Sequence, residues 1–140
     1  MEMQTIEPTD DQLRAFAREA VDDAPIIMLN LLRYRAQAHY SAHPHESPCS
    51  GRDAFKRYAK LSIVCIEASG GKVLFMGNAA ASVIGPVDEQ WDDIFLVQYP
   101  SRAAFLQMIA TPEYRAINFH RSAALQDSRL IPVRAKLNNL

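Results

Sequence analysis

One apolar run, PIIMLNLLRYR at residues 25–35, constrains the fold of this chain more than any other segment. In a β-strand, successive side chains point to opposite faces of the sheet, and in this run both faces are apolar. One face carries Ile27, Leu29 and Leu31, and the other carries Ile26, Met28 and Leu32. A sheet with two apolar faces must be covered on both sides. A chain of 140 residues has few layers for this purpose, so we expect a second copy of the chain to supply one cover.

Helix-start signals and apolar periodicity divide the rest of the chain into elements. A capping box with Thr9 and Gln12 predicts a first helix that ends near Asp22 or Asp23. A long helix begins at residue 50 and ends at the glycines at 70–71. Its inward stripe is predicted to hold Phe55, Tyr58, Leu61, Cys65 and Ala68. The other predicted elements are strands over residues 26–34, 72–84, 91–99 and 129–135, and a helix that begins at 101 and restarts at 111.

After the first helix, the predicted order is β-α-β-β-α-β. This order is typical of the ferredoxin-like, split βαβ fold, an α+β architecture with a four-stranded antiparallel sheet and two main helices on one face. We therefore predict a single domain over residues 1–140, with an N-terminal helix at about 9–23 and the core at about 25–135. Pro132 cannot donate a hydrogen bond to a neighbouring strand, so the last strand is predicted at an edge of the sheet.

The two main helices of such a fold cover only one face of the sheet. An exposed apolar face forfeits about 25 cal/mol for each Å² left in water. We expect two chains to bury their open faces against each other as a homodimer through the sheet faces. The alternative is that the N-terminal helix of the same chain folds over the open face.

Composition and charge exclude several classes of protein. The formal net charge is −1, so the chain lacks the basic surface of a nucleic-acid binder. No apolar run approaches the roughly 20 residues that cross a bilayer, and the polar, acidic start MEMQTIEPTDDQL is unlike a secretory signal. Cys49 and Cys65 form no CxxC pair, which suits a reduced compartment. We expect a cytoplasmic protein with no nucleic-acid or membrane partner.

Five segments together resemble the blocks of the domain of unknown function 1330 family. In chain order they are PIIMLNLLRYR, SGRDAFKRYAKL, GGKVLFMGN, QWDDIFLVQYPSRAAFLQMIATPEYRAINFHRSAAL and DSRLIPV, within residues 25–133. The resemblance implies the dimeric α+β barrel superfamily, and therefore a homodimer. That superfamily includes cofactor-independent monooxygenases, muconolactone isomerase-like enzymes, haem-dependent chlorite dismutases and stress-response proteins. The family itself has no settled activity, so the resemblance supplies no catalytic residues.

Four residues near the predicted strands are candidates for function. Asn30 interrupts an apolar strand; it either bonds to a neighbouring loop or donates to a ligand carbonyl or bound oxygen in a cavity. Arg33 either pairs at a solvated strand end or neutralises an acidic ligand. Trp91 is either a packing anchor or a ligand contact. Asp93 either pairs with Arg33, Arg35 or Arg129, or acts as a base.

Two helices add further candidates. His120 is either a surface residue or an acid, base or ligand. Arg121 shares a side of its helix with apolar residues, which predicts a partly buried guanidinium with a carboxylate partner and a contact to any ligand. Tyr58 is either core packing or part of a pocket wall. The loop at residues 36–50 carries metal-capable groups, but their spacing matches no zinc signature, so no metal site and no cofactor are predicted. These groups are His39, His43, His45 and Cys49.

The leading hypothesis is a small dimeric protein that binds or transforms a small organic molecule in a pocket between sheet and helices. If it is an enzyme, cofactor-free oxygenation or isomerisation is expected, with Asn30 or Trp91 stabilising negative charge and His120 or Asp93 moving a proton. The first alternative is a non-catalytic stress or interaction protein without a pocket, and the second is a haem or metal protein. The predicted ligand contacts are Asn30, Arg33, Tyr58, Trp91 and Arg121, and the catalytic candidates are Asn30, Asp93 and His120.

Overall fold

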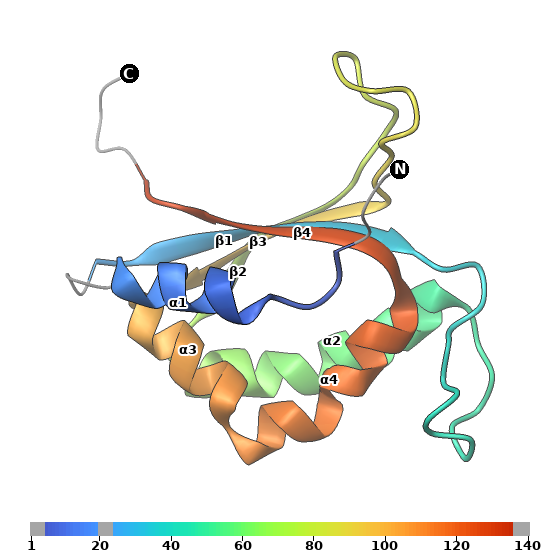
Figure 1. Cartoon of the computed structure of the whole chain (residues 1–140), viewed down its shortest axis with the longest axis horizontal. Helices are drawn as coiled ribbons and strands as arrows, with labels where there is room; N and C mark the ends of the chain where they lie inside the picture. Colours follow the sequence, from blue (N-terminus) through green and yellow to red (C-terminus); the bar gives the residue numbers. More distant parts are fainter. Residues whose placement is uncertain (1–4, 20–23, 136–140) are drawn as a thin grey trace.

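A computed structural model describes residues 5–19 and 24–135, and there it shows a four-stranded antiparallel sheet with four helices (Figure 1). The strand order β2-β3-β1-β4 is that of the predicted ferredoxin-like fold. The sheet stays open and does not close into a barrel. The elements are α1 (Asp10–Arg18), β1 (Ile26–Tyr34), α2 (Gly51–Ala68), β2 (Lys72–Asn78), β3 (Asp93–Tyr99), α3 (Arg102–Ala110), α4 (Pro112–Ala124) and β4 (Leu125–Val133).

The apolar run forms β1, an inner strand that pairs with β3 on one side and β4 on the other. Its bounds agree with the prediction. Ile26, Met28 and Leu32 lie on the helix-covered face and are at most 3% exposed. Asn30 shares their parity along the strand and lies opposite Phe95 of β3. The register therefore places one polar side chain in the middle of the face that the helices cover.

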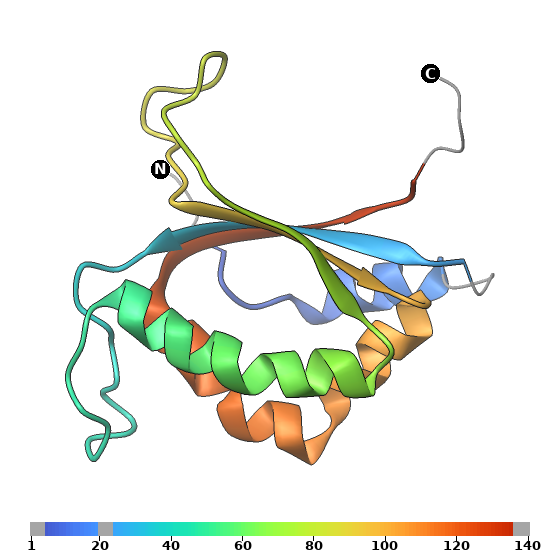
Figure 2. The same cartoon turned by 180° about the vertical axis from the view of Figure 1, so that it is seen from behind.

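All four helices lie on one face of the sheet (Figures 1 and 2). α1 is among them, because Phe16 of α1 packs edge to face against Phe105 of α3, with ring centroids 5.6 Å apart. The alternative that the N-terminal helix folds over the opposite face is therefore wrong. On that opposite face, Ile131 and Val133 of β4 remain exposed. As predicted from Pro132, β4 is an edge strand.

Four strand boundaries differ from the prediction. β3 begins at Asp93 rather than at residue 91, and β4 ends at Val133 rather than at residue 135. Strand pairing explains the other two. β2 ends at Asn78 instead of reaching residue 84, since Asn78 lies opposite Asp93, the first residue of β3. Residues 79–90 then form a largely exposed segment without regular structure. β4 begins at Leu125 rather than at residue 129, because α4 runs straight into the strand and Leu125 pairs with Tyr34 of β1.

The helix-end signals are confirmed where the structure describes them. Thr9 and Gln12 form both halves of the predicted capping box. Ser50 caps α2, and Gly70 follows α2 with a φ of 84°, the left-handed conformation that glycine tolerates. The predicted end of the first helix is wrong: α1 ends at Arg18 with Glu19 as its C-cap, before residues 22–23, which lie outside the described residues.

The buried stripe of α2 is only partly the predicted one. Phe55 is buried, but Leu61 is 43% exposed and Ala68 is also exposed. Ser62 and Ile66 are buried in their place. Steps of about 3.6 residues per turn from Phe55 arrive at these two positions, whereas the predicted stripe drifts around the helix.

Candidate ligand-binding cavity

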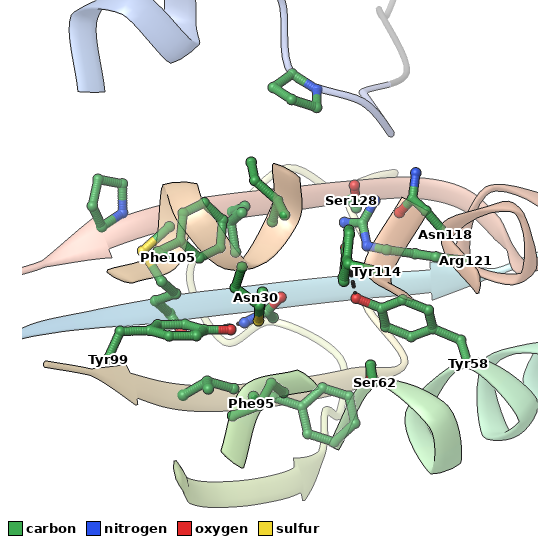
Figure 3. A pocket seen from close by; sticks show the side chains of 18 of the residues that line it. Asn30, Tyr58, Ser62, Phe95, Tyr99, Phe105, Tyr114, Asn118, Arg121 and Ser128 are labelled. Atoms are coloured by element: carbon green, nitrogen blue, oxygen red, sulfur yellow. Dashed lines mark hydrogen bonds between the residues drawn. The ribbon is translucent and has the colours of Figure 1, made fainter. Parts of the chain in front are cut away.

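A cavity of about 1100 Å³ lies between the helix-covered face of the sheet and the helices (Figure 3). All four strands and all four helices of the described chain contribute to its wall, together with residues 5–8 before α1. Leu74, Phe75 and Met76 of β2 line it and are exposed, so the cavity reaches the surface at that edge of the sheet. Most of the lining side chains are apolar.

Aromatic rings form much of the wall. Phe55 of α2 stacks on Phe95 of β3, with centroids 5.8 Å apart and planes 7° from parallel. Tyr99 of β3 and Phe105 of α3 meet edge to face at 5.1 Å. Burial raises the pKa of Tyr99, so its hydroxyl stays protonated at neutral pH. Walls of this kind suit a molecule with a flat apolar body.

Asn30 brings a polar group into this apolar space from the middle of β1. Its Nδ2 donates to the carbonyl of Met28, 3.1 Å away on the same strand, rather than to a neighbouring loop. Within the described residues, no group donates to its Oδ1. Asn30 therefore offers an unused acceptor on the cavity side of the sheet.

Tyr58 of α2 and Tyr114 of α4 join their hydroxyl groups across the cavity wall, with 2.8 Å between the oxygens. Burial is the main cause that raises the pKa of both phenols, so both are protonated at neutral pH. One hydroxyl donates to the other. The accepting hydroxyl keeps its own proton, which can be donated to a ligand.

Arg121 of α4 is 8% exposed and lines the same end of the cavity (Figure 3). Its Nη1 donates to the main-chain carbonyl of Ile6 at 2.6 Å. Among residues 5–19 and 24–135, no carboxylate oxygen lies within 4.0 Å of its guanidinium, so the described residues do not supply the predicted carboxylate partner. The inner side of α4 faces the cavity and the N-terminal segment, and that segment supplies a carbonyl instead.

The N-terminal segment is fastened over this end of the cavity. Thr5 exchanges two hydrogen bonds of 2.6 Å with Ser128 of β4, and its amide donates to Asp127 at 2.9 Å. The Glu7 carboxylate accepts from Ser122 at 2.6 Å and from Asn118 at 3.3 Å. Glu7, the acid next to Ile6 in the sequence, therefore already accepts hydrogen bonds from two uncharged side chains.

Arg102, the first residue of α3, is a second buried cation on the cavity wall. Its Nη2 lies 3.4 Å from the Glu19 carboxylate, and its guanidinium lies over the Phe16 ring at 4.6 Å. Sequence reasoning missed this residue. An arginine directly after a helix cap such as Ser101 carries no pattern that distinguishes it from a solvated side chain.

Asp93, a catalytic candidate, does not line the cavity. Its carboxylate accepts from Tyr34 at 2.6 Å, from Asn78 at 2.8 Å and from Arg52 at 3.1 Å. These three donors favour the structural interpretation, in which Asp93 pairs with an arginine, although the partner is Arg52 of α2.

His120, another catalytic candidate, is buried but faces away from the cavity. Its Nδ1 lies 2.7 Å from the Tyr40 hydroxyl, and its Nε2 lies 3.9 Å from Glu46, both in the loop at residues 36–50. Burial lowers the pKa of His120, and Arg57 and His43 lower it further, against the opposing effect of Glu46. The histidine therefore holds the loop against α4.

Arg33 and Trp91 lie at a different place from the other predicted ligand contacts. They line a hollow of about 200 Å³. Arg33 lies at an odd-numbered position of β1, so it belongs to the open face of the sheet, and in the strand register it lies opposite Asp127 of β4. The guanidinium of Arg129 lies over the Trp91 ring at 4.9 Å and forms an ion pair with Asp127. The structure thus brings together Asn30, Tyr58 and Arg121 but leaves Arg33 and Trp91 outside the large cavity.

The metal-capable groups of the loop do not converge. His43 stacks on Phe119 of α4 at 3.9 Å. In the described part of the chain, no group of three or more histidine, cysteine or acidic residues has an arrangement that could hold a metal ion. None of the helices described is long and apolar enough to cross a membrane.

The topology and the cavity together define a ferredoxin-like α+β protein with an internal space between sheet and helices. The chain belongs to the family described as domain of unknown function (DUF1330), whose sequence pattern matches residues 48–134. This match begins later in the chain than the resemblance seen in the sequence. Comparison with curated proteins found no match.

Solved structures agree with this assignment. A protein of unknown function from Rhodopseudomonas palustris is 39% identical, with a TM-score of 0.87 over 96% of this chain and 99% of that one. Its methylated form gives a TM-score of 0.89 over 99% and 100% of the two chains. The hydroxynitrile lyase from Passiflora edulis is 11% identical, with a TM-score of 0.57 over 85% of this chain and 100% of that one, and shares the fold alone.

Proposed function

We propose that this protein binds a small organic molecule in the cavity between the sheet and the helices. The size of the space is the observation that carries the proposal. Protein interiors are close-packed and contain few voids larger than a water molecule, whereas ligand sites commonly hold about 300–1,000 Å³. A mainly apolar space of about 1100 Å³ with unused polar groups inside it matches a ligand site.

Binding has more support than the proton-transfer chemistry considered from the sequence. Asp93 and His120 lie outside the cavity, and of the catalytic candidates only Asn30 lines it. The carboxylates in the described lining, Glu7 and Glu19, are exposed and bonded to neighbouring residues. Cofactor-free oxygenation or isomerisation therefore remains the second candidate function. Its support is that Asn30 and the protonated hydroxyl groups of Tyr58 and Tyr114 line the cavity. The alternative of an interaction protein without a pocket has the least support.

We also propose that the chain forms a homodimer through the open face of the sheet. Leu29 and Leu31 of β1 and Ile131 of β4 share this face by register. No described helix covers it, since α1 packs with the other helices (Figure 2). A second copy that covers this face would leave the cavity, on the other side of the sheet, free for a ligand.

The cavity proposal can be tested with Nile red, a neutral dye that fluoresces in apolar surroundings. Ser62 is 4% exposed and lines the cavity from α2, so Ser62→Phe places a ring inside the cavity. Val64 of the same helix is 66% exposed and does not line the cavity, which makes Val64→Phe the matched control.

The dye should bind the wild type and the Val64→Phe variant with similar affinity. Binding to Ser62→Phe should weaken by about tenfold or more, because the ring occupies space that the dye needs. Circular dichroism of both variants checks that they are folded. Equal dye binding by folded Ser62→Phe, or no binding by the wild type, would count against a ligand site in this cavity.

A further inference from the structure

We infer that the ligand of this cavity is a carboxylic acid with an apolar or aromatic body, and that Arg121 binds its carboxylate. This inference rests on the proposed function and names the chemical class of the ligand. It comes from the charge and the unused hydrogen-bonding capacity of one end of the cavity.

The first step concerns the charge of Arg121. A guanidinium stays protonated in proteins and presents five N–H donors. In this structure one of them, at Nη1, is bonded to Ile6, and the side chain is 8% exposed. Burying a cation without a counter-charge is costly, and buried charges are normally paired. Arg121 has no carboxylate partner within the described residues, so a bound anion would supply the counter-charge that these residues do not.

The second step separates Arg121 from the other cavity cation. Arg102 has a charge partner, the exposed Glu19 carboxylate at 3.4 Å, and lies over the Phe16 ring, although its buried Nη1 has no hydrogen-bond partner among the described residues. Glu7, next to Ile6 in the chain, accepts from Ser122 and Asn118 at one oxygen, Oε1, and its carboxylate lies more than 4.0 Å from the Arg121 guanidinium. Asp127 of β4 lines the smaller hollow rather than the cavity; burial raises the pKa of its carboxyl, but hydrogen bonds from the amides of Thr5 and Ser128, and then Arg129, outweigh burial and hold that pKa below its usual range. Arg121 is thus the buried cation of the lining that lacks a charge partner in the described chain.

The third step concerns the neighbours of Arg121 and the shape of the ligand. The paired hydroxyl groups of Tyr58 and Tyr114 lie beside Arg121 at one end of the cavity, and Asn30 lies between that end and Phe105 (Figure 3). A single guanidinium fork matches the two oxygens of one carboxylate, and the spare tyrosine proton adds another donor. The remainder of such a ligand would extend past the polar Asn30 toward the apolar wall at Phe105.

The experiment compares acids with their uncharged primary amides of the same shape. The probes are phenylacetate with phenylacetamide, and naphthylacetate with naphthylacetamide, measured by isothermal titration calorimetry on the full chain at neutral pH. The wild type should bind at least one acid about tenfold or more tightly than its amide, because a charge-assisted bidentate pair is stronger than a neutral hydrogen bond. The acids should also displace Nile red.

Variants at two positions of α4 assign the effect to Arg121. In Arg121→Met the preference for the acid over the amide should disappear while amide binding persists. Arg121→Lys keeps the charge but loses the fork, so it should retain only part of the preference. Arg115 is exposed on the same helix, so Arg115→Met is the matched control and should behave as the wild type.

The outcomes separate this inference from the proposed function. Equal binding of acid and amide by the wild type overturns the inference, and that comparison does not depend on any variant folding. A preference for the acid that survives in Arg121→Met also overturns the inference. The inference fails as well if the wild type binds no acid at millimolar concentration but still binds Nile red, and if Ser62→Phe blocks that dye binding. In these cases the cavity still binds ligands. If Ser62→Phe does not affect dye binding either, the proposed function fails as well.

Discussion

At the scale of single residues, Asp93, Arg121 and His120 are all buried, but their polar groups are satisfied in different ways. Asp93 accepts from three side chains. His120 is held by Tyr40 under a loop, whereas Arg121 has one bonded nitrogen and faces a cavity. Burial alone therefore does not mark a functional residue here. Unused hydrogen-bonding capacity beside an open space is the more specific sign.

The burial of His120 predicts a dependence of stability on pH. The pKa of His120 in the folded protein lies below the ordinary value of 6.5, mainly because of burial. As the pH falls through about 6.5, the unfolded chain takes up a proton that the folded chain does not, so the free energy of unfolding should decrease. Chemical denaturation at several pH values between roughly 8 and 5.5 measures this slope.

Two substitutions test whether His120 causes that slope. His120→Gln can still bond to Tyr40 but does not titrate, so its stability should vary less with pH than that of the wild type. His39 is exposed in the same loop, and His39→Gln should leave the slope unchanged. An unchanged slope in His120→Gln would show that groups other than His120 cause the dependence.

The candidate site could be predicted from the sequence only where strand and helix parity decided the matter. Asn30 lines the cavity because its parity along β1 fixes its face of the sheet. Arg33 has the opposite parity, so it could have been placed on the other face from the same argument. The contact between Arg121 and Ile6 joins residues far apart in the chain, and no local pattern reports it. The loop that buries His120 is equally non-local.

At the scale of elements, α1 is the helix most dependent on local signals. It has no buried residue, so its capping box and a few contacts, such as the one from Phe16 to Phe105, hold it in place. It nevertheless forms part of the cavity wall. Local opening of α1 would therefore enlarge access to the cavity without unfolding the sheet.

Removing the cap should loosen α1 selectively. Thr9→Ala deletes the side-chain acceptor for the amide of Gln12, and such a loss costs about 1 kcal/mol, which corresponds to about fivefold faster amide exchange. Hydrogen exchange followed by mass spectrometry should show this change in α1 and not in β1. Ser47→Ala, at an exposed loop position, is the control. Unchanged exchange in α1, or equal acceleration in β1, would contradict the selective opening.

Elements whose ends depend on local chemistry were predicted better than those whose ends depend on partners. The capping residues Thr9 and Ser50 and the glycine after α2 mark helix ends through contacts within a few residues. The end of β2 depends on where β3 begins, which is a property of the pair. A run such as residues 72–84 therefore overestimates the length of a strand whose partner is short.

At the scale of the whole molecule, the sheet has one face covered by helices and one face without a cover in the described chain (Figures 1 and 2). The covered face contains the cavity in which we propose that a ligand binds. The open face carries aliphatic side chains on inner and edge strands, including the exposed Ile131 and Val133. Apolar surface of this kind is rarely left in water unless a partner covers it. In the proposals made above, the two faces therefore have separate roles, one for the ligand and one for assembly.

The separation of roles predicts that assembly can be disrupted without loss of the cavity. Leu29 lies in the middle of the open face, between Leu96 and Ile131 on the neighbouring strands. Leu29→Asp should convert a dimer into a monomer at micromolar concentration, because two copies would each bury an unpaired carboxylate near the twofold axis. Val64→Asp, on an exposed position of α2, should leave the dimer intact.

Size-exclusion chromatography with multi-angle light scattering measures the mass of each species, and Nile red binding reports on the cavity of the same samples. The folded Leu29→Asp monomer should still bind the dye, since the substituted side chain lies on the opposite face of the sheet from the cavity. A wild type that is monomeric at micromolar concentration would disprove the dimer. A Leu29→Asp variant that remains dimeric would place the interface on another surface, such as the exposed strand β2.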